Sequence, residues 1–327
     1  MPEISRRTMA IVTLSLAAAG GSLPRLAWAQ EFPVRPIRIF VGQAAGSGSD
    51  VLCRYFAEEV GKLAGQPMIV ENRPGAGGNL ATQAVASARG DGHALLFSTS
   101  NSLTGNFFLF RNVGFKLEDF APVASVAETG VALAVKGDSA ITDVAELTTF
   151  LRQKQGKARY GAPTSTALTA AELYLDLTGT AAVRVPYRSA PQALTDLTGG
   201  EIDFFFVDAV TGLGPARRGQ IRLLGVTTRD RLEAAPDLPT MHEAGVTGYE
   251  LGAWFGIFAP AGTPASAREK LTQWFVEIAQ RPATKEFLLR AGVEPLPGAP
   301  EALMKIVAAH TETYRRLASA GKIKPQD

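Results

Sequence analysis

The feature that most constrains the fold is a repeated unit of a short apolar strand, a loop of small residues and an amphipathic helix. The first unit has a strand at 37–41, a glycine- and serine-rich loop at 42–49 and a helix at 50–63 whose apolar residues recur at helical spacing. A second unit follows, and a third strand at 94–97 ends in Ser98-Thr99-Ser100. Such repeats predict an α/β fold with a mostly parallel sheet and helices on both faces.

The same pattern starts again after residue 130, which predicts a second α/β lobe. Two long amphipathic helices close the chain, one over 265–291 with a break near Pro282 and one over 301–320. Because they bring no strands of their own, we expect them to pack on the first lobe. The chain then crosses between the lobes twice, with lobe 1 formed by 30–126 and 252–327 and lobe 2 by 127–251. The strands expected in lobe 2 are 131–135, 158–160, 183–185, 203–207 and 221–226.

The first 29 residues have the pattern of an export signal. Arg6 and Arg7 precede an apolar stretch at 9–20 that is too short to span a bilayer, and Ala27-Trp28-Ala29 supplies a cleavage pattern. We therefore expect a signal peptide that is cleaved after Ala29, and a protein in the periplasm. Ser5-Arg6-Arg7 is similar to a twin-arginine signal, so the route, Sec or Tat, stays open. No later apolar run reaches about 18 residues, so we expect a soluble mature chain.

Composition and motifs exclude several classes of function. Lys and Arg (33) nearly balance Asp and Glu (31), and no stretch of sequence clusters the basic residues, so nucleic acid is not an expected partner. One cysteine, Cys53, which we expect to be buried and inert, and three histidines argue against a disulfide or a metal site. Nucleophile-elbow, phosphate-loop, dinucleotide and zinc-protease motifs do not occur. We expect neither a cofactor nor an enzyme, and a hydrolase or isomerase ranks last among the hypotheses.

Three loops of small residues suggest how a ligand could be held. The segments 43–49, 75–79 and 163–167 contain no Lys or Arg, and each opens a helix whose first N–H groups and macrodipole attract a carboxylate. Taken singly, each loop could be an ordinary tight turn with Ser49 or Asn79 as helix cap. Three such loops in two lobes favour a binding site for an anion without a cationic side chain.

At this point the residues carry a resemblance to a known family. The stretch VENRPGAGGN at 70–79, with GGEID at 199–203, PDLPT at 236–240 and WFG at 254–256, resembles the Bug family. These proteins are the extracytoplasmic solute-binding receptors of tripartite tricarboxylate transporters. The resemblance covers essentially the whole mature chain.

The resemblance implies a two-lobed periplasmic-binding-protein fold of type II-like form that closes on a small organic acid, usually a mono- or dicarboxylate. It implies delivery to the membrane permease of a tripartite tricarboxylate transporter, and we expect a monomer. An alternative is a ligand sensor of the same fold that docks on a signalling receptor. The ligand stays open among aliphatic, aromatic and amino acids. This chain has Gly46-Ser47 where the family has paired glycines, and its 162–168 loop lacks the usual glycine and following histidine.

The candidate ligand-binding residues combine these loops with polar or aromatic side chains near strand ends. Asp208 could accept a ligand ammonium or cap the next segment, and Trp254 could stack on a ligand or fill the hinge. The full set is Ala45, Gly46, Ser47, Ser49, Asp50, Gly77, Gly78, Asn79, Thr99, Ser100, Asn101, Thr164, Ser165, Thr166, Tyr187, Asp208 and Trp254.

Overall fold

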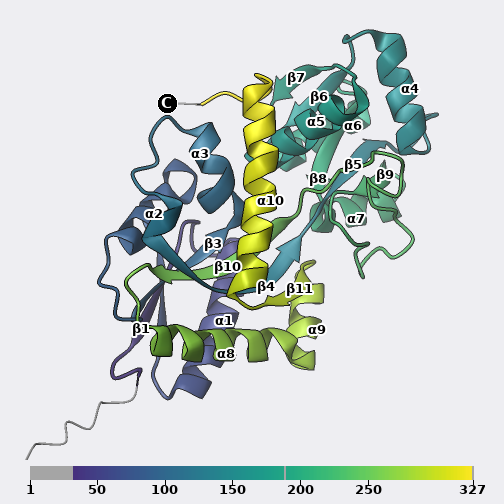
Figure 1. The fold of residues 1–327 in the computed structure, drawn as a ribbon. Coiled ribbons are helices and arrows are strands. Elements are labelled where there is room, and N and C mark those ends of the chain that lie inside the picture. The colour runs from purple at the N-terminus through teal and green to yellow at the C-terminus, as the bar shows by residue number, and fades with distance from the viewer. Residues whose placement is uncertain (1–31, 188, 326–327) are drawn as a thin grey trace, which may run out of the picture.

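The computed structural model describes residues 32–187 and 189–325, which form two lobes (Figure 1). The predicted signal peptide and its cleavage site lie outside the described residues. Within them, six strands form the first sheet, in the order β11-β4-β10-β3-β1-β2. These strands are β1 (Ile37–Val41), β2 (Met68–Asn72), β3 (Ala94–Thr99), β4 (Phe120–Thr129), β10 (Ala253–Pro260) and β11 (Glu294–Gly298).

Helices surround the first sheet. They are α1 (Gly48–Ala64), α2 (Asn79–Ala86), α3 (Asn106–Leu109), α8 (Ala265–Gln280), α9 (Pro282–Arg290) and α10 (Pro300–Ser319), with the short turns η1 (Ala76–Gly78), η2 (Asn101–Gly105) and η3 (Leu117–Asp119). The second sheet has, among the described residues, five strands in the order β7-β6-β8-β5-β9. Its elements are β5 (Val131–Lys136), α4 (Val144–Lys154), β6 (Arg159–Ala162), α5 (Ser165–Thr178), β7 (Val183–Pro186), α6 (Ala190–Gly199), β8 (Phe204–Asp208), α7 (Ala209–Arg217) and β9 (Ile221–Val226).

Both sheets are mixed, which corrects the expectation of mostly parallel sheets. β1 pairs in parallel with β2 and β3, whereas β10 runs antiparallel to β3 and β4. Likewise β6 pairs in parallel with β7 and β8, whereas β5 runs antiparallel to β8 and β9. The reason is the crossing between lobes. β5 and β10 each follow a segment that comes from the other lobe. They therefore begin beside the carboxyl ends of the parallel strands and run back in the opposite direction.

The closing helices pack on the first lobe as expected, and α8 ends just before Pro282. Two features were not expected. β11 lies between α9 and α10 and adds an edge strand whose prolines, Pro295 and Pro297, are tolerated because it has a neighbour on one side only. In addition, α10 continues past β4 to contact α5 of the second lobe (Figure 1), where Leu317 joins the second lobe's core.

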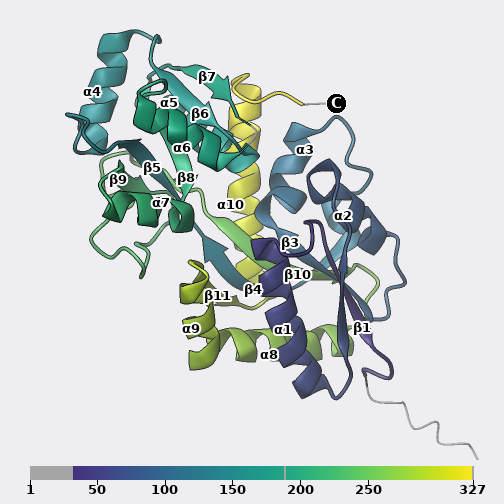
Figure 2. The ribbon, with the colours of Figure 1, turned by 180° about the vertical axis from the view of Figure 1, so that it is seen from behind.

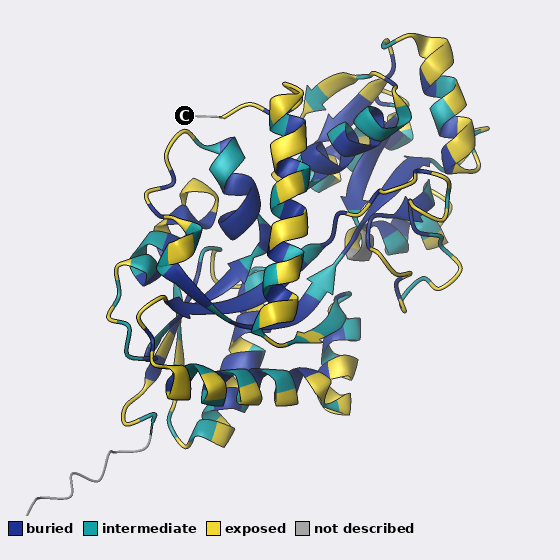
Figure 3. Cartoon of the chain, viewed as in Figure 1, coloured by how far each residue is buried: buried dark blue, intermediate teal, exposed yellow. Residues whose placement is uncertain are grey.

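Helices cover both faces of the first sheet, which agrees with the repeated strand and helix units. Phe56 of α1 and Phe275 of α8 are buried against one face, and Val85 of α2 and Val307 of α10 against the other. Figure 3 shows buried strands beneath helices whose outer sides are exposed. Cys53 is buried on α1, and burial raises the pKa of its thiol well above the ordinary value, as expected for an inert cysteine. No helix among the described residues has the length and hydropathy of a membrane span.

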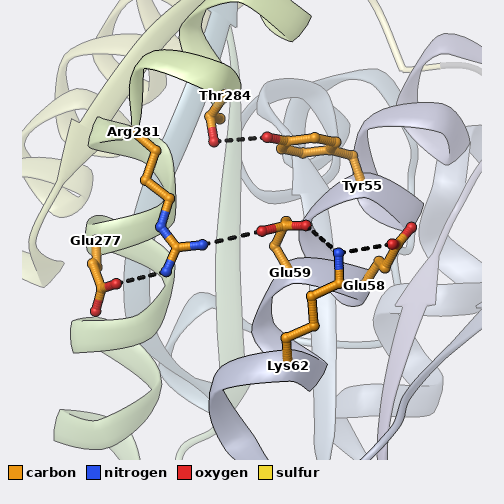
Figure 4. Close-up of polar contacts among 7 residues, drawn as sticks. All are labelled: Tyr55, Glu58, Glu59, Lys62, Glu277, Arg281 and Thr284. Atoms are coloured by element: carbon orange, nitrogen blue, oxygen red, sulfur yellow. Dashed lines mark hydrogen bonds and ion pairs between the residues drawn. The ribbon is translucent and has the colours of Figure 1, made fainter.

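Polar contacts join α1 to the turn between α8 and α9 (Figure 4). The Arg281 guanidinium lies 3.0 Å from Glu59 of α1 and 2.7 Å from Glu277 of α8. The hydroxyls of Tyr55 and Thr284 are 2.9 Å apart. Since Arg281 bridges two carboxylates, these contacts fix α1, whose other end opens into the candidate site, relative to the last helices of the chain.

A carboxylate lies where the chain crosses between the lobes. Glu128 is near the end of β4, opposite Glu294 of β11, and Asp230 and Glu250 belong to the return crossing. Burial, together with repulsion from these three carboxylates, raises the pKa of Glu128 to about 7. Near neutral pH, the folded protein therefore holds a proton that the unfolded chain has released.

We predict that the free energy of unfolding falls as pH rises from about 4.5 to about 7, because Glu128 binds its proton more tightly in the folded state. Glu128→Gln should stabilise the protein by about 1–3 kcal/mol at pH 7.5 and reduce this pH dependence. Urea denaturation across the pH range measures both. Glu118→Gln, on the exposed turn before the same strand, serves as control. A Glu128→Gln protein with an unchanged pH profile would show that this carboxyl titrates normally.

Candidate functional site

The loop after β1 is built around the carboxylate of Asp50. Asp50 Oδ2 accepts hydrogen bonds from the Gly46 N–H at 2.8 Å and from Arg54 Nε at 3.0 Å. Asn72 Nδ2 donates to Asp50 Oδ1 at 2.8 Å, and Arg54 Nη2 donates to Asn72 Oδ1 at 3.0 Å. Ser47, and not Ser49, caps α1, because its Oγ accepts from the Asp50 N–H at 3.3 Å. The loop, the helix and β2 are therefore tied to one carboxylate.

Asp50 supports the loop and is not free to bind a ligand. The residue is 2% exposed and both of its oxygens are engaged. Burial acts to raise the pKa of Asp50, but the hydrogen bonds from Arg54, Gly46 and Asn72 outweigh burial and lower the pKa to about 2. Because Arg54 is paired with Asp50, the charge of this carboxylate is balanced locally and does not repel an anion at the start of α1.

Two glycines let the first two loops approach each other. A Cβ on Gly42, which directly follows β1, would lie 2.6 Å from the Gly78 Cα. Gly78 has a φ of +94°, and a Cβ there would lie 2.9 Å from Ser102 Oγ. A Cβ on Gly77, with a φ of +64°, would lie 3.1 Å from the ring of Phe110. Glycine is thus required at 77 and 78 by backbone conformation and by close packing.

Some backbone N–H groups of the turn at 75–79 are already hydrogen-bonded within the turn. The Gly78 N–H donates to the Gly75 carbonyl at 2.9 Å, and the Asn79 N–H donates to the Ala76 carbonyl. In the described chain, no hydrogen bond is made by the N–H groups of Ala76 and Gly77. The donors available to an anion in this loop therefore precede Gly78 and Asn79.

The first turns of α1 and α5 leave further donors unused. Within the described residues, the N–H groups of Gly48 and Ser49 in α1 make no hydrogen bond, and neither do those of Ser165 and Thr166 in α5. Thr164 caps α5 by accepting from the Ala167 N–H at 3.1 Å. Figure 2 shows that the N-terminal end of α1 faces the second lobe. Helix N-termini of this kind attract anions through their N–H groups and the macrodipole.

The loops of the two lobes meet at Asn101, which follows β3. Asn101 Nδ2 donates to Thr166 Oγ1 at 3.3 Å, and the Tyr314 hydroxyl of α10 donates to Asn101 Oδ1 at 2.7 Å. Thr99 Oγ1 lies 3.3 Å from Ser102 Oγ, the atom that faces Gly78. The structure thus brings together the loops after β1, β2, β3 and β6.

The remaining second-lobe candidates lie along one edge of the second sheet. Since β6, β7 and β8 are parallel, their carboxyl ends place 164–166, Tyr187 and Asp208 at the same edge. The Tyr187 hydroxyl donates to Asp196 Oδ2 at 2.8 Å, and burial together with this bond raises the pKa of Tyr187 to about 12. Ala45 and Gly46 are exposed at their loop tip, whereas Ser100 is buried.

Three predicted site side chains are held by the protein itself. Asn79 Oδ1 accepts from Asn106 Nδ2 at 2.7 Å. Asp208 Oδ1 accepts from the Thr211 N–H at 3.4 Å, which is the capping alternative. Trp254 is 1% exposed and packs in the core beneath α10, so its ring offers no face for a ligand to stack on.

Sequence reasoning missed four residues that shape the site. Gly42 allows the close approach of the first two loops, and Ser102 fills the space beside Gly78. Asn106 donates to the Gly77 carbonyl and to Asn79, and Tyr314 reaches Asn101 from the far end of the chain. A glycine at the end of a strand was a readable signal for Gly42. The segment that contains Ser102 and Asn106 showed no helical pattern, and nothing local marks Tyr314.

Comparison with known proteins finds one family and several relatives that match most of this chain. The family described as "Tripartite tricarboxylate transporter family receptor" matches residues 52–321. A UPF0065 protein of Bordetella bronchiseptica is 34% identical over 323 residues, covering 98% of this chain and 94% of the relative. Protein BugT of Bordetella pertussis is 30% identical, covering 94% and 95%.

Solved structures with the same fold include two with bound acids. An R. palustris protein with adipate has a TM-score of 0.75 and 30% identity, and covers 90% of this chain and 100% of its own. MatC from Rhodopseudomonas palustris with bound malate has a TM-score of 0.70 and 28% identity, and covers 88% and 100%.

We predict that Asp50→Asn lowers the free energy of unfolding by about 2–3 kcal/mol at pH 7, because an amide cannot accept all of the hydrogen bonds that the carboxylate accepts. The pKa of Asp50 is lowered in the folded state, so its contribution is present above about pH 4 and is lost as pH falls toward 2. The difference in stability between wild type and variant should therefore shrink over this range in urea denaturation. Asp143→Asn, at the exposed cap of α4, should change stability little. Equal effects of the two substitutions would contradict this role for Asp50.

Proposed function

This chain belongs to the tripartite tricarboxylate transporter receptor family, and from that premise we propose that it captures a small organic carboxylate between its two lobes and delivers it to a membrane permease. The family consists of periplasmic solute-binding receptors. We further propose that the chain is exported, that cleavage follows Ala29, that it acts as a monomer, and that it has no enzymatic activity. We also propose that residues 30–126 and 252–327 form lobe 1 and that residues 127–251 form lobe 2.

One observation gives the proposal its main support. Among the described residues, two helix N-termini, that of α1 in one lobe and that of α5 in the other, leave backbone N–H groups unused, and Asn101 after β3 links the first lobe to Thr166 in the first turn of α5. No Lys or Arg belongs to these loops, and Arg54 is engaged by Asp50 and Asn72. A carboxylate held here would be neutralised by backbone dipoles and hydroxyl groups.

We propose that the ligand-contacting groups are the Ala45–Ser49 tip, the N–H groups of Ala76 and Gly77, the Thr99–Asn101 segment, Thr164–Thr166 and Tyr187. Asp50, Gly78 and Asn79 hold these loops in place. The relatives solved with adipate and malate bind dicarboxylates, which makes these two acids the first probes for this chain.

We predict that the protein, unfolded and refolded to release any bound small molecule, binds adipate or malate in a calorimetric titration and does not bind the uncharged adipamide. Affinity should change less than about threefold between 50 and 300 mM NaCl, because buried contacts are weakly screened. Bound acid should also raise the melting temperature. Failure of a wider panel of mono- and dicarboxylates to bind would contradict the proposal.

We predict that Gly78→Val abolishes carboxylate binding, because a β-branched residue cannot keep the positive φ and would clash with Ser102. Gly245→Val is the matched control, since Gly245 has a φ of +95° but open space around its Cβ position. Arg73→Gln should weaken binding less than threefold, because its guanidinium lies 4.8 Å from the Phe40 ring centroid and takes no part in the site. Circular dichroism must first show that each variant is folded.

Normal binding by a folded Gly78→Val protein, together with loss of binding in the Arg73 variant, would identify an arginine-anchored site and overturn the backbone account. Loss of binding in both valine variants would show that backbone strain alone was responsible.

A further inference from the structure

A second group of charged residues forms a pocket on the first lobe, apart from the candidate site. The pocket has a volume of about 530 Å³ and lies between α2 and the strands β1 and β3, with Arg73 contributed from just after β2. Four arginines line it: Arg35, Arg38, Arg73 and Arg89. They are spread over 55 positions of the sequence, so the fold alone brings them together. We call this group the arginine pocket.

The guanidinium groups of the arginine pocket are held in place but remain accessible. Those of Arg38 and Arg73 lie 4.9 and 4.8 Å from the ring centroid of Phe40, which forms the floor. The side chains of Arg35, Arg38 and Arg73 are 46–50% exposed. Stacking on an aromatic floor orders the guanidinium planes while it leaves their edges free to donate hydrogen bonds.

Two carboxylates lie among these arginines and do not balance them. Glu71 pairs with Arg38 and lies 3.6 Å from Arg73, and Asp91 lies 2.8 Å from Arg35. The Arg38 hydrogen bond lowers the pKa of the Glu71 carboxyl, which is therefore ionised. Four arginines against two carboxylates leave a local formal charge of +2. Residues 30–327 as a whole carry 30 basic and 30 acidic side chains, so this excess is a property of the arginine pocket and not of the chain.

The arginine pocket is separate from the proposed ligand site. Arg35 and Asp91 lie before the start of β1 and β3, at the end of these strands opposite the candidate site, whereas Arg73 directly follows β2 and is the lining residue closest in sequence to the 75–79 turn. The residues that line the pocket include none of the proposed ligand-contacting groups. An occupant could therefore bind the first lobe without displacing a ligand held between the lobes.

We infer that the arginine pocket docks an acidic, carboxylate-bearing segment of the membrane component of the transporter. The inference rests on the proposed function, because that function supplies a membrane partner. It adds the place on the receptor and the chemistry of the partner that this place fits.

An acidic segment fits the arginine pocket better than a single small anion. Each arginine is exposed, and an isolated exposed ion pair contributes about 0–1 kcal/mol, so a small anion that reaches one or two of them binds weakly. A segment with several carboxylates engages several arginines at once, and the contacts add because they belong to one chain. Surface charge of this kind also speeds encounter and makes it dependent on salt.

The test measures binding of the full mature chain to the tripartite transporter's membrane component in nanodiscs, by biolayer interferometry at 50 and 300 mM NaCl. The double variant Arg73→Gln with Arg89→Gln should bind at least tenfold more weakly at 50 mM and show a smaller salt dependence. Arg290→Gln, an exposed arginine of α9, is the control and should bind as wild type does. A synthetic glutamate hexamer should compete, and a glutamine hexamer should not.

Three results would overturn the inference: no binding of the wild-type chain to the membrane component, equal loss in the control variant, or competition by inorganic phosphate or malate as strong as that by the glutamate hexamer. Titration of the same double variant with adipate and malate separates this inference from the proposed function. Unchanged acid binding with lost docking supports both. If the wild-type chain docks but binds no carboxylate, and the double variant does not dock, the arginine pocket is supported and the proposed ligand is removed.

Discussion

The Asp50 carboxylate is the interaction on which the candidate site depends. It accepts hydrogen bonds from the Gly46 N–H, from Arg54 and from Asn72, and so fixes the loop after β1 against both α1 and β2. Burying a charge is costly unless it is paired and hydrogen-bonded, and here each oxygen is engaged. The arrangement also commits the nearest arginine to a structural role. The start of α1 is thus left with unused N–H groups and without a free cation.

A site whose hydrogen-bond donors are backbone N–H groups requires glycine at particular positions and close packing of its loops. Gly42 lies so close to the Gly78 backbone that it cannot carry a side chain, and Gly78 needs a positive φ and has Ser102 against its Cβ position. Such a site neutralises a carboxylate through dipoles that are already oriented, so little reorganisation is needed when the ligand arrives. We propose that specificity among acids depends on the surrounding hydroxyl groups, including those of Ser47, Thr164 and Thr166.

Much of the fold could be predicted from local patterns. The strand at 37–41 and the strand at 221–226 have the predicted bounds, because a short apolar run between loops is a strong signal. Strand directions could not be predicted, since they depend on where the chain re-enters each sheet. β11 and the η2–α3 segment were missed, because Pro295 and Pro297 resemble a loop and because 101–109 has no amphipathic period.

For the site, the sequence indicated loops and not the roles of individual side chains. Asp50 is a candidate ligand-binding residue by its place at the loop after the first strand, yet its hydrogen bonds with Gly46 and Asn72 make it a support for that loop. Trp254 could have faced a ligand or the core, and only the packing of α10 decides between the two. The arginine pocket shows the same limit, because Arg35, Arg73 and Arg89 are far apart in sequence and meet only in the fold.

The most direct test of the central claim is a titration of ¹⁵N-labelled protein with the acid that calorimetry shows to bind, followed by two-dimensional NMR. If backbone dipoles hold the carboxylate, the amide protons of Ser49, Gly77 and Thr166 shift downfield on binding, and the Nε–H signals of Arg54 and Arg73 stay unchanged. Large shifts of the arginine signals with unmoved loop amides would contradict the account.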